Sequence, residues 1–153
     1  MKELISKIKK YNDLSPVKVG IAVLALYSVL LILISVMHEP WHDEAQAWQI
    51  AKYASYHDMI FYLPHYESHP PLWHLILSVP AKLGAPYELS IKAINILFSV
   101  AGVFIIEFRS RFTNWVKTFI PFTYFIFYQY GAISRPYSMM LLAILLCALF
   151  FDD

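Results

Sequence analysis

Long apolar runs separated by short polar stretches dominate the pattern of this chain. Residues 17–37 and 89–108 each approach the ~20 apolar residues with which an α-helix crosses a bilayer. Two more apolar runs, 118–133 and 137–151, are shorter, and the first of them is rich in aromatic residues. The pattern predicts an all-α, polytopic transmembrane protein with four spans in one domain, residues 1–153.

The segment 70–83 is the ambiguous part of this pattern. It holds only about 14 apolar-rich residues, a length more typical of an interfacial or re-entrant segment than of a span. If it does not cross, Arg109, Arg111 and Lys117 lie on the same side as the N-terminal lysines, as the positive-inside rule requires. If it crosses, these three cations lie outside. We therefore expect 70–83 to be an interfacial helix.

The topology that follows has a cytoplasmic N-terminus and a long extracytoplasmic loop, 38–88. This loop should hold interfacial helices over about 43–57 and 70–83, and a short interfacial helix should precede the first span. The first apolar run is too long for a signal-peptide core and no small-residue cleavage site follows it, so it is a retained span. We expect a multi-pass membrane protein.

Composition supports a membrane protein and excludes some function classes. Hydrophobic residues make up 59% of the chain and charged residues 15%, which is too apolar for an ordinary soluble surface. The net charge is +1, and no basic cluster with interleaved aromatic residues is present, so a nucleic-acid partner is not expected. Membrane lipids are the partners that this composition implies.

The loop 38–88 concentrates the candidate chemistry. It contains all six histidines and six of the 11 acidic residues. Such side chains offer nitrogen and oxygen ligands that suit zinc or manganese. No cofactor follows from the sequence, but a divalent metal remains open, with Asp43, Glu67 and His65 as candidate ligands.

The letters HEPWH, residues 38–42, match the H-E-x-x-H motif of zinc proteases. That motif works because two histidines one helical turn apart face the same way. Here Pro40 lacks an N–H, clashes with the preceding turn and favours an extended Glu39. We therefore expect the first span to end near His38, with His38 at its solvated end and no zinc-protease site.

A second helix can begin directly after this proline. Asp43 is a favourable N-cap, and Gln46 three residues later suggests a capping box. A carboxylate fixed at a helix start on the membrane surface, beside Glu44, could also act as a base. The two roles are compatible, since a base must be held in place.

Three segments together resemble the membrane-embedded family C glycosyltransferases, which use lipid-phosphate sugars and include protein mannosyltransferases and aminoarabinose transferases. The segments are Asp43–Glu44, HPPLWHLIL at 69–77 and SRPYSMMLLA at 134–143. The resemblance implies inverting transfer of a sugar from a polyprenyl-phosphate donor to an acceptor on the extracytoplasmic side. Its bacterial members imply the cell (inner) membrane as the location. Members of that family are longer, so we expect this chain to correspond to their N-terminal part.

The resemblance also implies roles for individual residues. Asp43, with Glu44, is the expected catalytic carboxylate, which takes the proton of the acceptor hydroxyl. The donor phosphate is expected to contact His69 and Arg135. A carboxylate that many members carry near the position of Arg135 is absent here. The residues expected to line the substrate site are Trp41, Tyr66, Glu67 and Tyr137.

Structural roles compete with several of these assignments. The aromatic residues of the loop are also typical of a membrane interface. His69 directly precedes a proline pair that can start a helix, and Arg135 can extend its charged end to the interface. Two other functions remain open: a small His-rich, metal-binding membrane protein with His65, His69 and His74 as ligands, and an inactive membrane remnant.

Overall fold

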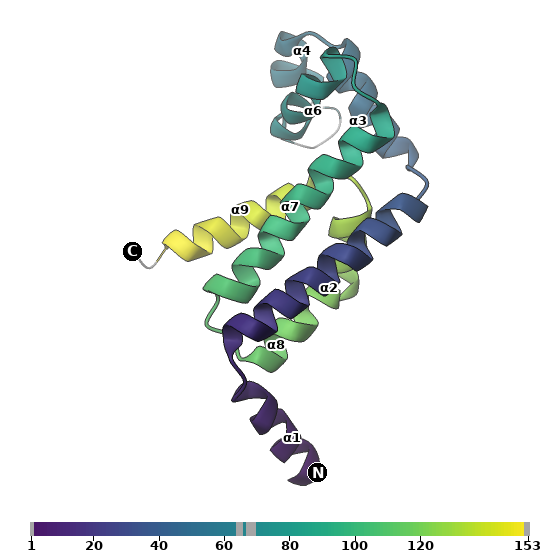
Figure 1. The fold of residues 1–153 in the computed structure, drawn as a ribbon. Coiled ribbons are helices and arrows are strands. Elements are labelled where there is room, and N and C mark those ends of the chain that lie inside the picture. The colour runs from purple at the N-terminus through teal and green to yellow at the C-terminus, as the bar shows by residue number, and fades with distance from the viewer. Residues whose placement is uncertain (1, 64–65, 67–69, 152–153) are drawn as a thin grey trace.

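The protein is built from helices joined by short connections (Figure 1). The computed structural model describes residues 2–63, 66 and 70–151, and the described residues contain 82% helix and no strand. The all-α prediction is therefore confirmed. The elements are α1 (Lys2–Asn12), α2 (Pro16–Met37), α3 (His42–Tyr53), α4 (Tyr56–Phe61), α6 (Leu72–Lys82), α7 (Tyr87–Arg109), α8 (Asn114–Phe119), the 3₁₀-helix η1 (Ile120–Phe122), the π-helix η2 (Tyr124–Ala132) and α9 (Tyr137–Phe150).

Helices α2 and α7 run antiparallel and form the centre of the molecule (Figure 1). A proline occupies the first position of α2, where its missing N–H costs no hydrogen bond, and the helix ends three residues before Pro40. Tyr27, Leu31 and Val103 are fully buried between the helices. By length and composition, α2 and α7 can each cross a membrane.

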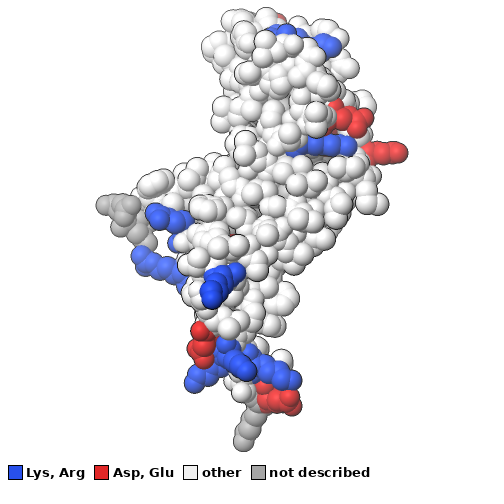
Figure 2. Space-filling model, in the orientation of Figure 1, with Lys and Arg blue, Asp and Glu red and all other residues white. Residues whose placement is uncertain are grey.

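The outward faces of these two helices carry large apolar side chains. Val36 is 73% exposed, Leu97 67% and Phe104 48%. Figure 2 shows a largely uncharged band across this part of the molecule, with Lys, Arg, Asp and Glu side chains on both sides of the band. A continuous apolar surface of this kind is suited to lipid or to a protein partner rather than to water.

Helices α3, α4 and α6 form a cap over the first residues of α7 (Figure 1). Trp48 and Leu77 contribute to a small apolar core that also includes Ile91 of α7. The single helix predicted over 43–57 is wrong, because α3 ends at Tyr53 and Ser55 then caps α4 by accepting a hydrogen bond from the Asp58 N–H (3.1 Å). The helix predicted over 70–83 is present as α6.

The predicted third span, 118–133, is not one helix. It is divided into the end of α8, η1 and η2. Pro121 has no N–H to continue the α8 hydrogen bonds, and Thr123 is extended (φ −66°, ψ 151°), so the chain breaks there. The π-helix η2 then follows for nine residues, an unusual length for a form that mostly occurs as single turns.

The fourth predicted segment, 137–151, is present as α9 to within one residue, but the helix is short for a span. Helix α9 has 14 residues, which corresponds to about 21 Å at 1.5 Å per residue and falls short of a ~30 Å hydrocarbon core. Two helices of membrane-spanning length are therefore established, and four spans are not.

The N-terminal helix and the connection between α7 and α8 lie at the same end of the α2–α7 pair. The Asn114 side-chain amide donates to the carbonyl oxygen of Leu14 (2.9 Å), and the hydroxyls of Tyr11 and Thr118 are 2.7 Å apart. The two cation-rich parts of the chain are thus neighbours.

Gly131, near the end of η2, is predicted to be the least replaceable of the helical glycines. A methyl group there would lie 2.9 Å from Leu31 Cδ1 and 3.0 Å from the Ile126 carbonyl oxygen. We expect Gly131→Ala to lower the free energy of unfolding by about 1–3 kcal/mol through overpacking. Gly102→Ala is the control, since its methyl would lie 3.7 Å from Leu145 Cδ1. Thermal unfolding in detergent compares the two, and equal losses would contradict this prediction.

Candidate functional site

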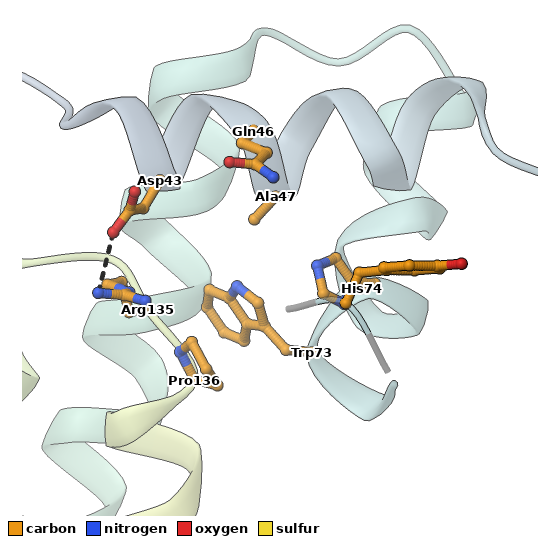
Figure 3. Close-up of a pocket in the computed structure, with 8 residues that line it drawn as sticks. Asp43, Gln46, Ala47, Trp73, His74, Arg135 and Pro136 are labelled. Carbon is orange, nitrogen blue, oxygen red and sulfur yellow. Dashed lines mark ion pairs between the residues drawn. The ribbon is translucent and has the colours of Figure 1, made fainter. Parts of the chain in front are cut away.

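Asp43 and Arg135 form an ion pair between the cap and the start of α9. Asp43 is in the first turn of α3, Arg135 is in the connection between η2 and α9, and Arg135 Nη1 lies 3.0 Å from Asp43 Oδ2 (Figure 3). The aspartate side chain is 49% exposed and the arginine side chain 20%. The structure therefore brings together two residues that the sequence predicted separately as base and phosphate ligand.

This pair lies at the mouth of a cavity of about 200 Å³. Figure 3 shows the side chains of α3 on one side and those of α6 and the α9 connection on the others. The three segments that resemble the glycosyltransferases all contribute residues to its wall. The lining residues are Asp43, Gln46, Ala47, Tyr66, Trp73, His74, Arg135 and Pro136.

Trp73 and His74 form the inner wall of this cavity. Their side chains are almost completely buried, at 1% and 2% exposure. The indole Nε1 of Trp73 has no hydrogen-bond partner among the described residues. A buried donor without a partner costs free energy, and a ligand oxygen in the cavity would satisfy it.

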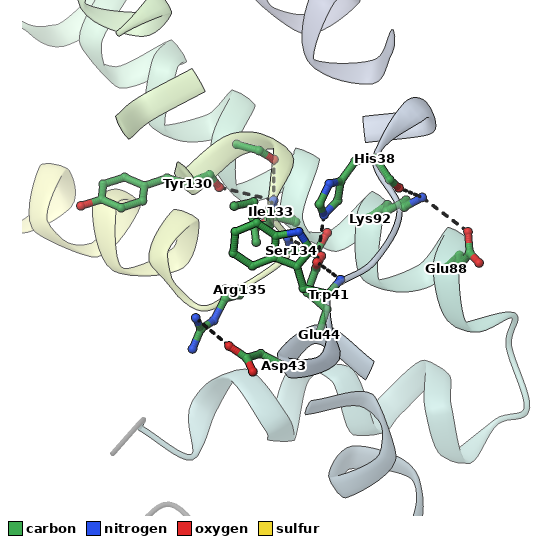
Figure 4. Close-up of polar contacts among 12 residues, drawn as sticks. His38, Trp41, Asp43, Glu44, Glu88, Lys92, Tyr130, Ile133, Ser134 and Arg135 are labelled. Atoms are coloured by element: carbon green, nitrogen blue, oxygen red, sulfur yellow. Dashed lines mark hydrogen bonds and ion pairs between the residues drawn. The ribbon is translucent and has the colours of Figure 1, made fainter. Parts of the chain in front are cut away.

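Glu44 is fully buried and ties three segments together beneath the ion pair (Figure 4). Its Oε2 atom accepts from the Trp41 backbone N–H (2.8 Å) and lies 2.9 Å from His38 Nε2. Its Oε1 atom accepts from the backbone N–H of Ser134 (2.7 Å). Since Ser134 precedes Arg135, this carboxylate fixes the segment that carries the guanidinium.

Asn95, buried on α7, holds the same segment from the other side. Its amide donates to the carbonyl oxygen of Gly131 (2.6 Å), and its own oxygen accepts from the Ser138 hydroxyl (2.6 Å). One helical turn earlier, Lys92 Nζ donates to the His38 carbonyl oxygen (2.9 Å). Side chains of α7 therefore position both chain segments that meet at the ion pair.

Two sequence predictions about α3 are wrong. The N-cap is Trp41, not Asp43, and the capping-box carboxylate is Glu44, which accepts the Trp41 N–H, not Gln46. The N-cap lies two residues earlier than predicted, because Pro40 sets an extended approach and Glu44 is then three residues beyond Trp41. Asp43 is left outside the capping interaction and faces the cavity. Glu44, the other predicted catalytic carboxylate, is fully buried and does not line the cavity.

The zinc-protease letters HEPWH do not form a metal site in this structure. His38 contacts Glu44, whereas His42 is exposed, and the described part of the chain holds no group of three His, Cys, Asp or Glu residues placed to bind a metal. The prediction that His38 is a solvated end is wrong, since its side chain is 7% exposed.

The other predicted site residues have different outcomes. Tyr66 lines the cavity and is 87% exposed. Trp41 and Tyr137 do not line it. The Trp41 ring lies beside His38, and the Tyr137 ring is 5.2 Å from the Arg135 guanidinium carbon. The predicted phosphate ligand His69 and the candidate ligands His65 and Glu67 lie outside the described residues.

Several lining residues were not predicted from the sequence. Gln46 and Ala47 follow Asp43 by three and four positions, so the helical period alone would have placed them on the same face. His74 and Pro136 could not be found that way, because their place depends on how α6 and α9 pack against α3.

Comparisons with protein families, with curated proteins and with solved structures find no match for this chain.

Proposed function

We propose that the protein transfers a sugar from a polyprenyl-phosphate donor to a hydroxyl-bearing acceptor, with inversion at the anomeric carbon. The observation that carries this proposal is the Asp43–Arg135 pair at the mouth of an aromatic cavity, beside two helices of membrane-spanning length. A lipid-linked donor has an apolar chain, an anionic phosphate and a polar sugar. The apolar outer surface suits the lipid chain, the Arg135 guanidinium suits the phosphate, and the cavity suits the sugar.

The ion pair suggests how the site would change when donor binds. The Arg135 guanidinium is a fork of donors that suits a phosphate, and the pair is partly exposed, so a phosphate can compete with Asp43 for it. Binding of the phosphate would release the Asp43 carboxylate. A carboxylate freed in this way can accept a proton from the acceptor.

The proposed reaction is a single displacement. The acceptor oxygen attacks the anomeric carbon on the face opposite the phosphate, and Asp43 takes its proton. The bond between the anomeric carbon and the phosphate oxygen breaks, and the electron pair leaves with the polyprenyl phosphate. Arg135 stabilises the charge that develops on that phosphate. Trp73 and Tyr66 offer aromatic faces for the sugar.

The role of Arg135 predicts selective recognition of the phosphate. In detergent, wild-type protein is expected to bind polyprenyl phosphate more tightly than the uncharged polyprenol, as followed by tryptophan fluorescence. Arg135→Gln should weaken phosphate binding by about tenfold or more, since a charged hydrogen bond contributes about 1.5–3 kcal/mol. Polyprenol binding should not change.

Lys52→Gln is the matched control for this experiment. It removes one exposed cation of the cap at a residue that does not line the cavity. Equal affinity of the wild-type protein for the phosphate and the alcohol would contradict the proposal. So would equal losses in the Arg135 and Lys52 variants.

A further inference from the structure

A second, larger hollow lies at the opposite end of α7 from the Asp43–Arg135 site. Its volume is about 540 Å³, and it lies between the C-terminal ends of α7 and α9. Because α7 has 23 residues, the two ends of this helix are about 34 Å apart. The lining residues are Ile105, Phe108, Arg109, Ser110, Arg111, Phe112, Leu145, Ala148, Leu149 and Phe150.

This second hollow combines apolar walls with two cations at one edge. Arg109 and Arg111 are exposed, and within the described part of the chain neither forms an ion pair or a side-chain hydrogen bond. Other cations of the α7 and α9 region are engaged. Lys117 donates to the Glu107 carbonyl oxygen (2.9 Å), and Lys92 donates to the His38 carbonyl oxygen (2.9 Å).

Among the described residues, no carboxylate lines the second hollow. The acid nearest in sequence, Glu107, is 1% exposed and faces α2, where its Cβ would lie 3.4 Å from a methyl group placed on Gly20. Glu107 therefore does not neutralise the two arginines by direct contact. Within the described residues, the hollow therefore combines two cations with apolar side chains and has no carboxylate.

We propose that the second hollow binds an anionic phospholipid. The phosphate would lie between Arg109 and Arg111, whose guanidinium groups can each donate two parallel hydrogen bonds to it. One acyl chain would follow Phe108, Leu145 and Leu149. The volume is within the about 300–1,000 Å³ range of small-molecule sites. This inference assumes that α7 crosses a membrane, and it does not depend on the sugar-transfer reaction.

The test measures lipid binding by titration in native mass spectrometry of the detergent-solubilised protein. Wild-type protein is expected to bind one dioleoyl phosphatidylglycerol at least tenfold more tightly than dioleoyl phosphatidylcholine. The Arg109→Gln/Arg111→Gln variant should lose at least tenfold of the affinity for phosphatidylglycerol. Its fold should be retained, because both side chains are exposed, and circular dichroism checks this.

A matched variant separates a defined site from general surface charge. Lys9→Gln/Lys10→Gln removes the same charge from exposed positions on α1, which do not line the second hollow. This variant should keep its affinity for phosphatidylglycerol within twofold. Equal losses of phosphatidylglycerol affinity in the two double variants would overturn the proposal, because lipid binding would then depend only on the net charge of the protein.

Two more ligands test whether the apolar walls matter. Dihexanoyl phosphatidylglycerol, with short chains, should bind at least tenfold more weakly than the dioleoyl lipid. Inorganic phosphate at millimolar concentration should not displace the dioleoyl lipid. Equal affinity for the short-chain and long-chain lipids, or displacement of the lipid by inorganic phosphate, would show a site that binds only the anionic group. Either result would overturn the proposal. None of these outcomes bears on the proposal that polyprenyl phosphate binds at Arg135.

Discussion

The Asp43→Asn variant is expected to lose at least a hundredfold of the sugar-transfer rate while it keeps the stability of the wild-type protein. Asparagine has nearly the same shape but cannot accept the proton of the acceptor, and a positioned base contributes about 10²–10⁴-fold to such a step. The ion pair with Arg135 is partly exposed, so its loss should change the free energy of unfolding by about 1 kcal/mol or less.

The rate constants separate catalysis from donor binding in this variant. For Asp43→Asn, kcat should fall while the KM for the lipid donor stays within a few-fold, because Arg135 still binds the phosphate. Glu39→Gln is the control, since Glu39 is an exposed acid of the same segment and does not line the cavity. It should keep the wild-type rate. An Asp43→Asn protein with more than half of that rate would rule out Asp43 as the base.

The second large effect is expected from Glu44→Gln. The glutamate accepts the backbone N–H groups of Trp41 and Ser134 on different oxygens. Glutamine has one oxygen and one NH₂ group, so one of these backbone N–H groups must face a donor and lose its partner. A buried N–H without a partner costs about 1–3 kcal/mol. We therefore expect a loss of that size in the free energy of unfolding.

Activity should fall together with stability in the Glu44→Gln protein, because the Ser134 N–H bond holds the segment that carries Arg135. Glu88→Gln is the control, since Glu88 is 63% exposed and its contact with Lys92 is 3.4 Å long. It should change the free energy of unfolding by less than about 0.5 kcal/mol. Thermal unfolding of both variants in detergent measures this, and equal midpoints would contradict the structural role of Glu44.

The long elements of the fold could be predicted from the sequence, because their apolar runs determine them. The lengths of α2 and α7 follow directly from runs of about 20 apolar residues. The break at Thr123 was missed, although Pro121 is visible in the sequence, since a proline in a first turn is compatible with a continuing helix. The bounds of α9 were also predicted to within one residue, because its apolar run is continuous.

The candidate site could be predicted only in part. Asp43 and Arg135 were chosen from separate motifs, and their ion pair depends on how the cap packs against α9. The role of Glu44 was missed for the same reason. The contact of the Glu44 carboxylate with the Ser134 N–H joins segments far apart in the chain. Local pattern cannot indicate such a contact.

The most direct test of the account is a transfer assay with purified protein in liposomes. The donors are polyprenyl-phosphate hexoses and pentoses with a radiolabelled sugar, and the acceptors are peptides with serine or threonine and glycolipids. The account predicts that wild-type protein releases polyprenyl phosphate from one of these donors and moves the label to an acceptor with inverted anomeric configuration, and that Asp43→Asn and Arg135→Gln do not. Release of polyprenyl phosphate at the same rate by wild type and both variants would contradict it.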